Sequence, residues 1–432
     1  MTDSCFIEIL KHEIVPAMGC TEPAASALAG AKARELIGKD EVAEVRISAS
    51  RDMVKNAMGV SIPGCLLKGL SAAVALGIAG GDTARKLSIL SDVDEKMVDY
   101  ASTLEPVLEL AGDVPSLYVC VSVKSKTGHE ASVTISGEHD SFSKVVLDGK
   151  VLNEVTSCGK ANGESDFFAD VTLGDVLSFA DNVKVEEIDF LKDAIKANFN
   201  IAKYGMSHCF GLQVGKTMAK DITGKPADIN QAFQLGAAYA AAGSDARMCG
   251  CPMPVYINSG SGNQGLTVTV PVKTVGEYLG AGEEKILRAV CVSELVGLML
   301  TEKKSRLSAL CGAFTAAIGT ACAYAYLFGG GAGAMDEVIN IMVANLTGII
   351  CDGAKKTCAL KIYSCLEAAA MAVRLAFNGQ CPDDKCGIVG ADSRESISHL
   401  SIISKEGMEG TDKTIYSIML DKVNSGSGNS LC

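Results

Sequence analysis

Cysteine has the most reactive side chain in this sequence, and the 432 residues include 17 of them. The opening segment MTDSCFIEIL has neither the basic region nor the apolar run of a secretory signal. We therefore expect a cytoplasmic protein whose thiols stay reduced. In that setting, many cysteines indicate buried small apolar residues, metal ligands or an anaerobic host rather than a disulfide framework.

Three cysteines recur at a spacing of seven residues: Cys351, Cys358 and Cys365. On one α-helix they would form a stripe that drifts by only about 20° per step, with about 10 Å between successive side chains. Ligands that far apart cannot share one metal ion. The spacing therefore favours a buried stripe of small residues, and at most one of the three belongs to a metal site.

Other common metal and nucleophile motifs are absent from the sequence. Cys249-x-Cys251 has no partner pair at zinc-finger spacing, and no C-x2-C-x2-C run occurs. No two histidines have the i, i+4 spacing of H-E-x-x-H, and there is no G-x-S-x-G elbow. Structural zinc, hydrolytic zinc and an elbow serine nucleophile are all disfavoured.

Residues 259–265, SGSGNQG, contain the pattern G-x-G-x-x-G. The following LTVTVPV has strand character, so we do not expect this loop to open a helix as a dinucleotide-binding loop does. Its backbone N–H groups, together with Ser259, Ser261, Asn263 and Gln264, suit a carboxylate or a phosphate. The alternative interpretation is a glycine-rich turn between two elements.

The charge balance argues against two classes of partner. Lys and Arg number 39 and Asp and Glu number 51, which gives a net charge of −12 with no basic block. Nucleic acid and anionic membrane are therefore not expected as partners. Residues 307–335 carry no charge and are long enough to span a bilayer, but their many small residues and the GGGAGA end predict a buried helix instead.

The elements that must position these residues change in character along the chain. Residues 1–40 have helical patterns, with Cys20 in the break between two helices. Residues 41–170 contain short β-branched runs and an Ala/Gly-rich helix, and residues 171–432 are mainly long apolar helices interrupted by the strand-like QGLTVTVPVKT. We predict an α+β fold in which a helical catalytic domain, 1–40 and 171–432, carries an inserted α/β domain, 41–170.

Several short motifs together resemble one known family. They are GCTEP at 19–23, Lys55-Asn56, SDARM at 244–248, NSGSGNQG at 258–265, RLSALC at 306–311 and ICDGAK at 350–355. In this order they resemble the YhaM-type L-cysteine desulfidases, whose C-terminal part is similar to the alpha chain of iron-sulfur L-serine dehydratases. The resemblance covers nearly the whole chain.

The resemblance implies a 4Fe-4S cluster held by Cys20, Cys311 and Cys351. Three ligands leave one iron open to act as a Lewis acid. The implied activity is an oxygen-sensitive lyase without pyridoxal phosphate that converts L-cysteine to pyruvate, ammonia and hydrogen sulfide. A cytoplasmic homodimer is expected at the level of the family, and Cys358 and Cys365 then belong to the core.

Substrate contacts and a base are further expectations. The loop at 259–265 and Thr21 are the candidates for binding the substrate carboxylate, with Arg247 and Asn56 as further polar contacts. The candidate bases are Lys55, ranked first, followed by His139 and His208.

The chain departs from the family pattern at two places. Lys55-Asn56-Ala57 stands where the family has Lys-Asn-Gly, and His139-Asp140-Ser141 stands where it has His-Thr-Asn. Two alternatives therefore stay open. One is a dehydratase of L-serine or another β-substituted amino acid on the same cluster, and the other is a non-catalytic amino-acid-binding iron-sulfur protein.

Overall fold

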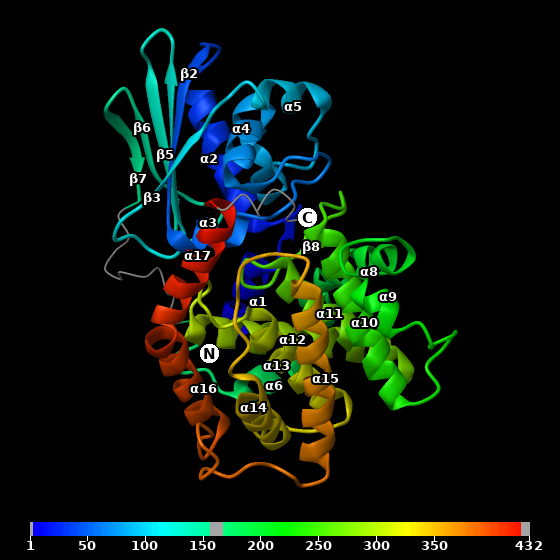
Figure 1. Cartoon of the computed structure of the whole chain (residues 1–432). Helices are drawn as coiled ribbons and strands as arrows, with labels where there is room; N and C mark the ends of the chain where they lie inside the picture. The colour runs from blue at the N-terminus through cyan, green and yellow to red at the C-terminus, as the bar shows by residue number, and fades with distance from the viewer. Residues whose placement is uncertain (1–2, 156–166, 425–432) are drawn as a thin grey trace.

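The computed structural model describes residues 3–155 and 167–424, and its side chains pack into two hydrophobic cores. One core lies between a sheet and its covering helices, in the upper part of Figure 1, and the other lies within the helices of the lower part. The fold is α+β and mainly helical, as the sequence predicted.

The sheet has six strands in the order β3-β2-β4-β5-β6-β7. Strands β2 and β3 pair in parallel, and every other neighbouring pair is antiparallel. Alternate residues of β4 and β5 are buried, which is the period of a sheet with one covered face. The strands are β2 (Val42–Ala49), β3 (Val107–Leu110), β4 (Tyr118–Ser125), β5 (Glu130–Ser136), β6 (Phe142–Leu147) and β7 (Lys150–Glu154).

Helix α2 (Thr21–Ile37) packs against the sheet, and helix α4 (Gly69–Gly80) packs against α2 (Figure 1). They approach closely because Gly77 has no side chain: a Cβ there would lie 2.1 Å from the carbonyl oxygen of Ala27. The other elements of this part are α3 (Arg51–Ala57), the 3-10 helix η1 (Thr83–Ser88) and α5 (Glu95–Ala101).

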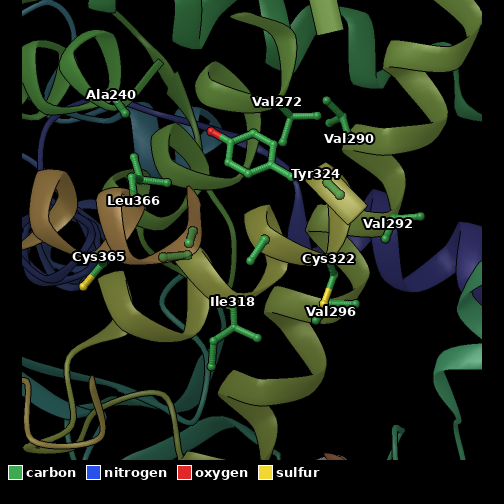
Figure 2. Close-up of a cluster of buried hydrophobic side chains, with 14 of the residues drawn as sticks. Ala240, Val272, Val290, Val292, Val296, Ile318, Cys322, Tyr324, Cys365 and Leu366 are labelled. Atoms are coloured by element: carbon green, nitrogen blue, oxygen red, sulfur yellow. The ribbon is translucent and has the colours of Figure 1, made fainter. Parts of the chain in front are cut away.

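Five helices build the helical core: α10 (Ile229–Met248), α11 (Gly262–Tyr278), α12 (Glu283–Lys304), α13 (Gly312–Leu327) and α15 (Cys358–Phe377). Figure 2 shows their contacts, where Tyr324 of α13 lies near Val272 of α11 and Leu366 of α15. Around them lie α1 (Asp3–Glu13), α6 (Leu173–Asn182), α7 (Val185–Ile188), α8 (Leu191–Ser207), α9 (Val214–Met218), α14 (Ala332–Leu346), α16 (Ser393–Ile402), the π-helix η2 (Ile403–Gly407) and α17 (Glu409–Asn424). A two-residue strand, β1 (Pro16–Ala17), pairs with β8 (Val255–Tyr256).

The strand expected from QGLTVTVPVKT is wrong, because these residues form helix α11. Burial overrides the strand preference of its β-branched residues, and the hydroxyls of Thr267, Thr269 and Thr274 each donate to the carbonyl four residues earlier. Pro271 has no N–H to donate to the Thr267 carbonyl, and Thr320 of α13 supplies that bond at 2.7 Å.

The uncharged stretch 307–335 contains α13, which is buried among its neighbours as predicted. No helix of the described residues is long and apolar enough to cross a membrane.

The two cores divide the N-terminal helices between them. Helix α1 packs in the helical core, whereas α2 packs against β4 and β5. The domain boundaries at 40/41 and 170/171 stay a prediction.

The seven-residue cysteine stripe does not run along one helix. Cys358 and Cys365 lie on α15, but Cys351 lies in the preceding loop. Cys365 is buried in the helical core as expected, whereas the expectation for Cys358 is wrong, because it is only partly buried and belongs to neither core. Every cysteine in the described ranges is a free thiol.

Candidate active site

A cavity of about 100 Å³ lies where the sheet part meets the helical part. Its walls come from the first residues of α2, α11 and α13, from α3, and from the loop before α15. Among the residues expected from the sequence, those that line it are Cys20, Thr21, Asn56, Arg247, Ser261, Asn263, Gln264, Cys311 and Cys351. The structure therefore brings together segments from both ends of the chain.

Three helices begin at this cavity. Cys20 is the N-cap of α2, Ser261 that of α11 and Cys311 that of α13. The side chain of Ser261 accepts a hydrogen bond from the N–H of Gln264, whereas the thiols of Cys20 and Cys311 make no such capping hydrogen bond to their helices. Helix N-termini present free N–H groups and a positive dipole end, so the cavity suits thiolates and anionic ligands.

Cys311, which is buried, and Cys351, which is partly buried, form a thiol pair. The hydrogen bond from the Cys311 thiol lowers the pKa of Cys351, and the Lys55 ammonium lowers it further, against the effect of burial. The same bond and burial raise the pKa of Cys311. One of the two sulfurs is thus favoured as a thiolate, which is the form that binds metal. Two backbone hydrogen bonds hold the segments that carry these cysteines together: Cys311 N donates to Ile349 O, and Cys351 N donates to Ala309 O.

Cys20 lies on the other side of the cavity, where its thiol donates to Glu22 Oε2 over 2.8 Å. Burial and the neighbouring Glu22 carboxylate raise the pKa of Cys20. Within the described ranges, no three His, Cys, Asp or Glu side chains form a ready site for a single metal ion. The three cysteines of a 4Fe-4S cluster bind three different irons, so thiols spread around one cavity are a fitting donor set. A fourth cysteine, Cys358, also lines the cavity, where its sulfur accepts from Lys355 N and its thiol donates to Gly353 O.

Polar atoms without partners face this region. Arg247 is 3% exposed, and its Nε has no hydrogen-bond partner among the described residues. The same holds for Asn56 Oδ1 and Asn263 Oδ1. Because buried polar atoms are almost always paired in folded proteins, these three side chains indicate a place that a ligand or water completes.

The glycine-rich loop places Arg247. A Cβ on Gly262 would lie 2.5 Å from Arg247 Nε, so only glycine lets the guanidinium lie against the start of α11. The Thr21 hydroxyl donates to Gly260 O over 2.7 Å, which ties α2 to this loop. Ser259, whose hydroxyl donates to Asn258, lies instead on the wall of the neighbouring cavity. The loop does open a helix, contrary to the sequence prediction.

Behind the loop lies a buried carboxyl group on α12. Asn258 Nδ2 donates to Glu294 Oε2 over 2.7 Å, while Glu294 Oε1 has no partner among the described residues. Burial raises the pKa of Glu294 to about 8, and the hydrogen bond from Asn258 opposes this. Glu294 is therefore neutral at pH 7.

Glu22 is a site residue that the sequence analysis missed. It is 7% exposed and accepts from the Cys20 thiol and, at 2.9 Å, from Asn56 Nδ2, while the Thr21 hydroxyl lies 3.3 Å from its Oε2. Burial raises its pKa, but nearby His139 and the hydrogen bonds from Cys20 and Asn56 outweigh burial and keep it lowered. An acidic residue in the first turn of a helix is ordinarily explained by the helix dipole, so its position in GCTEP gave no distinct signal.

Lys55 and Lys304 are both buried beside the cysteines but differ in their partners. Lys55, 1% exposed on α3, forms ion pairs with Asp52 and with Asp412 of α17. Those carboxylates keep the pKa of Lys55 raised despite burial, so its amine stays protonated. Lys304, also 1% exposed, donates to Ser305 O over 3.0 Å, and burial lowers its pKa to about 8.

The two candidate histidines lie in different places. His139 is 5% exposed, and a Cβ on Gly260 would lie 2.9 Å from its ring. Burial lowers the pKa of His139, and its Nε2 has no partner among the described residues. His208 is exposed at the end of α8, where it stacks on Tyr204. Neither histidine is among the residues that line the cavity, and His139 is the nearer of the two because it lies against Gly260, which bonds to the lining residue Thr21.

A larger cavity of about 720 Å³ adjoins the first. The two share Lys304, Arg306, Leu307 and Ser308. Arg306 forms an ion pair with Glu13 of α1 at this junction. The larger cavity therefore lies next to the cysteine-lined one, with Lys304 and Arg306 between them.

Comparison with known proteins shows which proteins this chain is similar to. A family model described as serine dehydratase alpha chain matches residues 84–417, a range that includes Cys311 and Cys351 but begins after Cys20. The chain is 38% identical over 423 residues to a UPF0597 protein of Lachnoclostridium phytofermentans, covering 96% of this chain and 99% of that one. UPF0597 proteins of Aeromonas salmonicida (37%) and Bacteroides thetaiotaomicron (35%) align over 96% of this chain, and over 96% and 97% of their own lengths.

Proposed function

The chain belongs to the serine dehydratase alpha-chain family, and from that premise we propose that it is an iron-sulfur lyase that eliminates sulfide from L-cysteine. The observation that carries the proposal is one cavity whose lining includes Cys20, Cys311 and Cys351, with Cys358 beside them, and the buried, incompletely bonded Arg247 and Asn56. Membership of the family supports a lyase of the serine dehydratase type, and the choice of cysteine rests on the resemblance of the motifs to desulfidases.

Cys20, Cys311 and Cys351 would hold the 4Fe-4S cluster. When bound, such a cluster supplies a Lewis-acidic iron that makes sulfide or hydroxide a better leaving group. The thiol pair Cys311–Cys351 supports this assignment because it already favours one thiolate. The start of α13 adds positive potential at Cys311.

Arg247 and the start of α11 would bind the substrate carboxylate. The guanidinium lies against Gly262, and the first N–H groups of α11 open onto the same cavity. A carboxylate there would complete the bonding of Arg247 Nε. Asn56 and Asn263 supply further polar contacts for orientation, with Thr21, Ser261 and Gln264 around them.

His139 is the residue we assign to removal of the Cα proton. Its pKa is lowered by burial, so the imidazole is neutral at pH 7 and Nε2 is able to accept a proton. The electron pair of the Cα–H bond forms the Cα=Cβ bond as the Cβ–S bond breaks and sulfide leaves. The aminoacrylate product tautomerises to an imine, which water hydrolyses to pyruvate and ammonia.

Lys55 and His208 are less suited to act as the base. The paired ammonium of Lys55 has no lone pair to accept a proton, and we assign it to the support of Cys351. His208 lies on the exposed end of α8. A proton-exchange assay separates the candidates: His139→Gln should abolish exchange of the substrate Cα proton with solvent deuterium, and His208→Gln should not.

L-serine is the second candidate substrate, favoured by the description of the family model. The deciding experiment reconstitutes the protein without oxygen and measures pyruvate from L-cysteine and from L-serine side by side. Faster turnover of cysteine, with one sulfide per pyruvate, supports a desulfidase. Turnover of L-serine alone would show that the protein is a serine dehydratase. Binding of these amino acids without formation of pyruvate would support a binding protein. We also propose that the protein is cytoplasmic, oxygen-sensitive and homodimeric. Sedimentation of the holoprotein in an anaerobic ultracentrifuge cell tests the homodimer.

A further inference from the structure

We propose that Glu22 binds the α-ammonium group of the substrate, opposite Arg247, and makes this cavity selective for amino acids over hydroxy acids of the same size. This inference rests on the proposed function, because it concerns the ligand of that same cavity. It assigns a specificity-determining role to a residue that the motif analysis did not select.

The charges of the cavity wall are the first argument. Glu22 is the one carboxylate among the described residues that line it, whereas the cations are Arg247, Lys304 and Arg306. Arg306 already has Glu13 as its partner. A ligand with a single negative charge would satisfy Arg247 and leave Glu22 without a counter-charge, but a zwitterion supplies both.

The bonding of Glu22 is the second argument. A thiol and an amide donate to Glu22, the Thr21 hydroxyl 3.3 Å away gives its one proton to Gly260 O, and no Lys or Arg of the described residues forms an ion pair with Glu22. A carboxylate offers about four acceptor positions, so some are left for an ammonium. Burying a carboxylate without a counter-charge is costly, and a bound cation offsets that cost.

The positions of the two charges are the third argument. Glu22 lies in the first turn of α2, and Arg247 lies beside Gly262 in the first turn of α11. The Thr21–Gly260 hydrogen bond joins these two helix starts. Asn56 donates to Glu22 and also lines the cavity, so it fixes the carboxylate from the α3 side. The two charges are therefore held at a fixed separation.

The test uses ligands that cannot be eliminated. L-alanine has both the ammonium and the carboxylate but no leaving group on Cβ, and L-lactate has a hydroxyl in place of the ammonium. Calorimetric titration of the anaerobic holoprotein should show that L-alanine binds about 10- to 100-fold more tightly than L-lactate, since charged hydrogen bonds are worth roughly that factor. Glu22→Gln should remove this preference by weakening L-alanine alone.

Two variants serve as controls. Glu294→Gln changes another buried carboxyl group, one that bonds to Asn258 and lies outside the lining of this cavity, so it should keep the preference for L-alanine. Glu22→Asp keeps the charge and should keep part of the preference. Iron content and thermal midpoint of each variant establish that it is folded and loaded.

Two outcomes would overturn the inference: an unchanged alanine-to-lactate ratio in Glu22→Gln, or an equal weakening of both ligands. Failure of the proposed function is a separate result. If L-alanine binds with the expected preference but no amino acid is turned over, the assignment of Glu22 stands and the lyase activity does not.

Discussion

The two sides of the cavity carry opposite buried charge. On the sheet side, formed by α2 and α3, Glu22 is ionised and Lys55 is neutralised by two aspartates. On the helical side, Arg247 and Lys304 form no ion pair with any carboxylate of the described residues, and the nearby Glu294 is neutral. A cavity with a negative side and a positive side suits a ligand that carries both a positive and a negative charge. Neither side considered alone would indicate such a ligand.

Loss of the cluster should have the largest effect, because its ligands come from both sides. We expect Cys351→Ala to reduce iron from about four per chain to near zero and lyase activity to background. Iron and acid-labile sulfide counted on anaerobic preparations check this. Cys365→Ala removes a core cysteine of α15 instead and should retain the iron. Full iron in the Cys351 variant would contradict the ligand assignment.

Replacing the buried lysine on each side of the cavity should lower the free energy of unfolding by different amounts. Lys55→Met leaves Asp52 and Asp412 without their cation, which should lower the free energy of unfolding by about 3–5 kcal/mol. Lys304→Met strands no carboxylate and should change it by less than about 1 kcal/mol. Urea titration of both apoproteins measures the difference. Equal losses would show that Lys304 has a partner as important as those of Lys55.

The neutral carboxyl group of the helical side should produce a pH dependence. The pKa of Glu294 is about 8 in the folded chain, above the ordinary 4.5, so the folded state holds a proton that the unfolded state releases. Its stabilising effect is full below pH 4.5 and is lost as pH rises to 8, at up to about 1.4 kcal/mol per pH unit. Glu294→Gln should flatten the unfolding free energy between pH 5 and 8. An identical slope in both proteins would show that Glu294 is ionised.

A smaller effect is expected from a substitution at Gly262, against which Arg247 packs. Gly262→Ala places a Cβ 2.5 Å from Arg247 Nε, so the guanidinium must shift. We expect affinity for L-alanine and L-lactate to fall by about tenfold, or about 1.4 kcal/mol, because both share the carboxylate. Gly59→Ala meets no atom within 4 Å and is the matched control. Unchanged affinity in the Gly262 variant would place the carboxylate elsewhere.

The sequence predicted the fold class and the nine cavity residues better than it predicted elements whose character depends on packing. Helix α11 was missed because local pattern reports β-branched residues, whereas burial and hydroxyl-to-carbonyl bonds decide the outcome. Lys304 was missed because it ends the charged run TEKK, which is typical of a solvated helix end. Only the packing of distant segments places it beside the cysteines.

The hydrogen bond from Thr21 to Gly260 has a consequence for biosynthesis. It joins a helix made at the start of translation to a loop made past the middle, and Cys351 emerges later still. Contacts between such distant segments form late in folding. A cluster held by Cys20, Cys311 and Cys351, as proposed, would therefore be assembled only on a nearly finished chain.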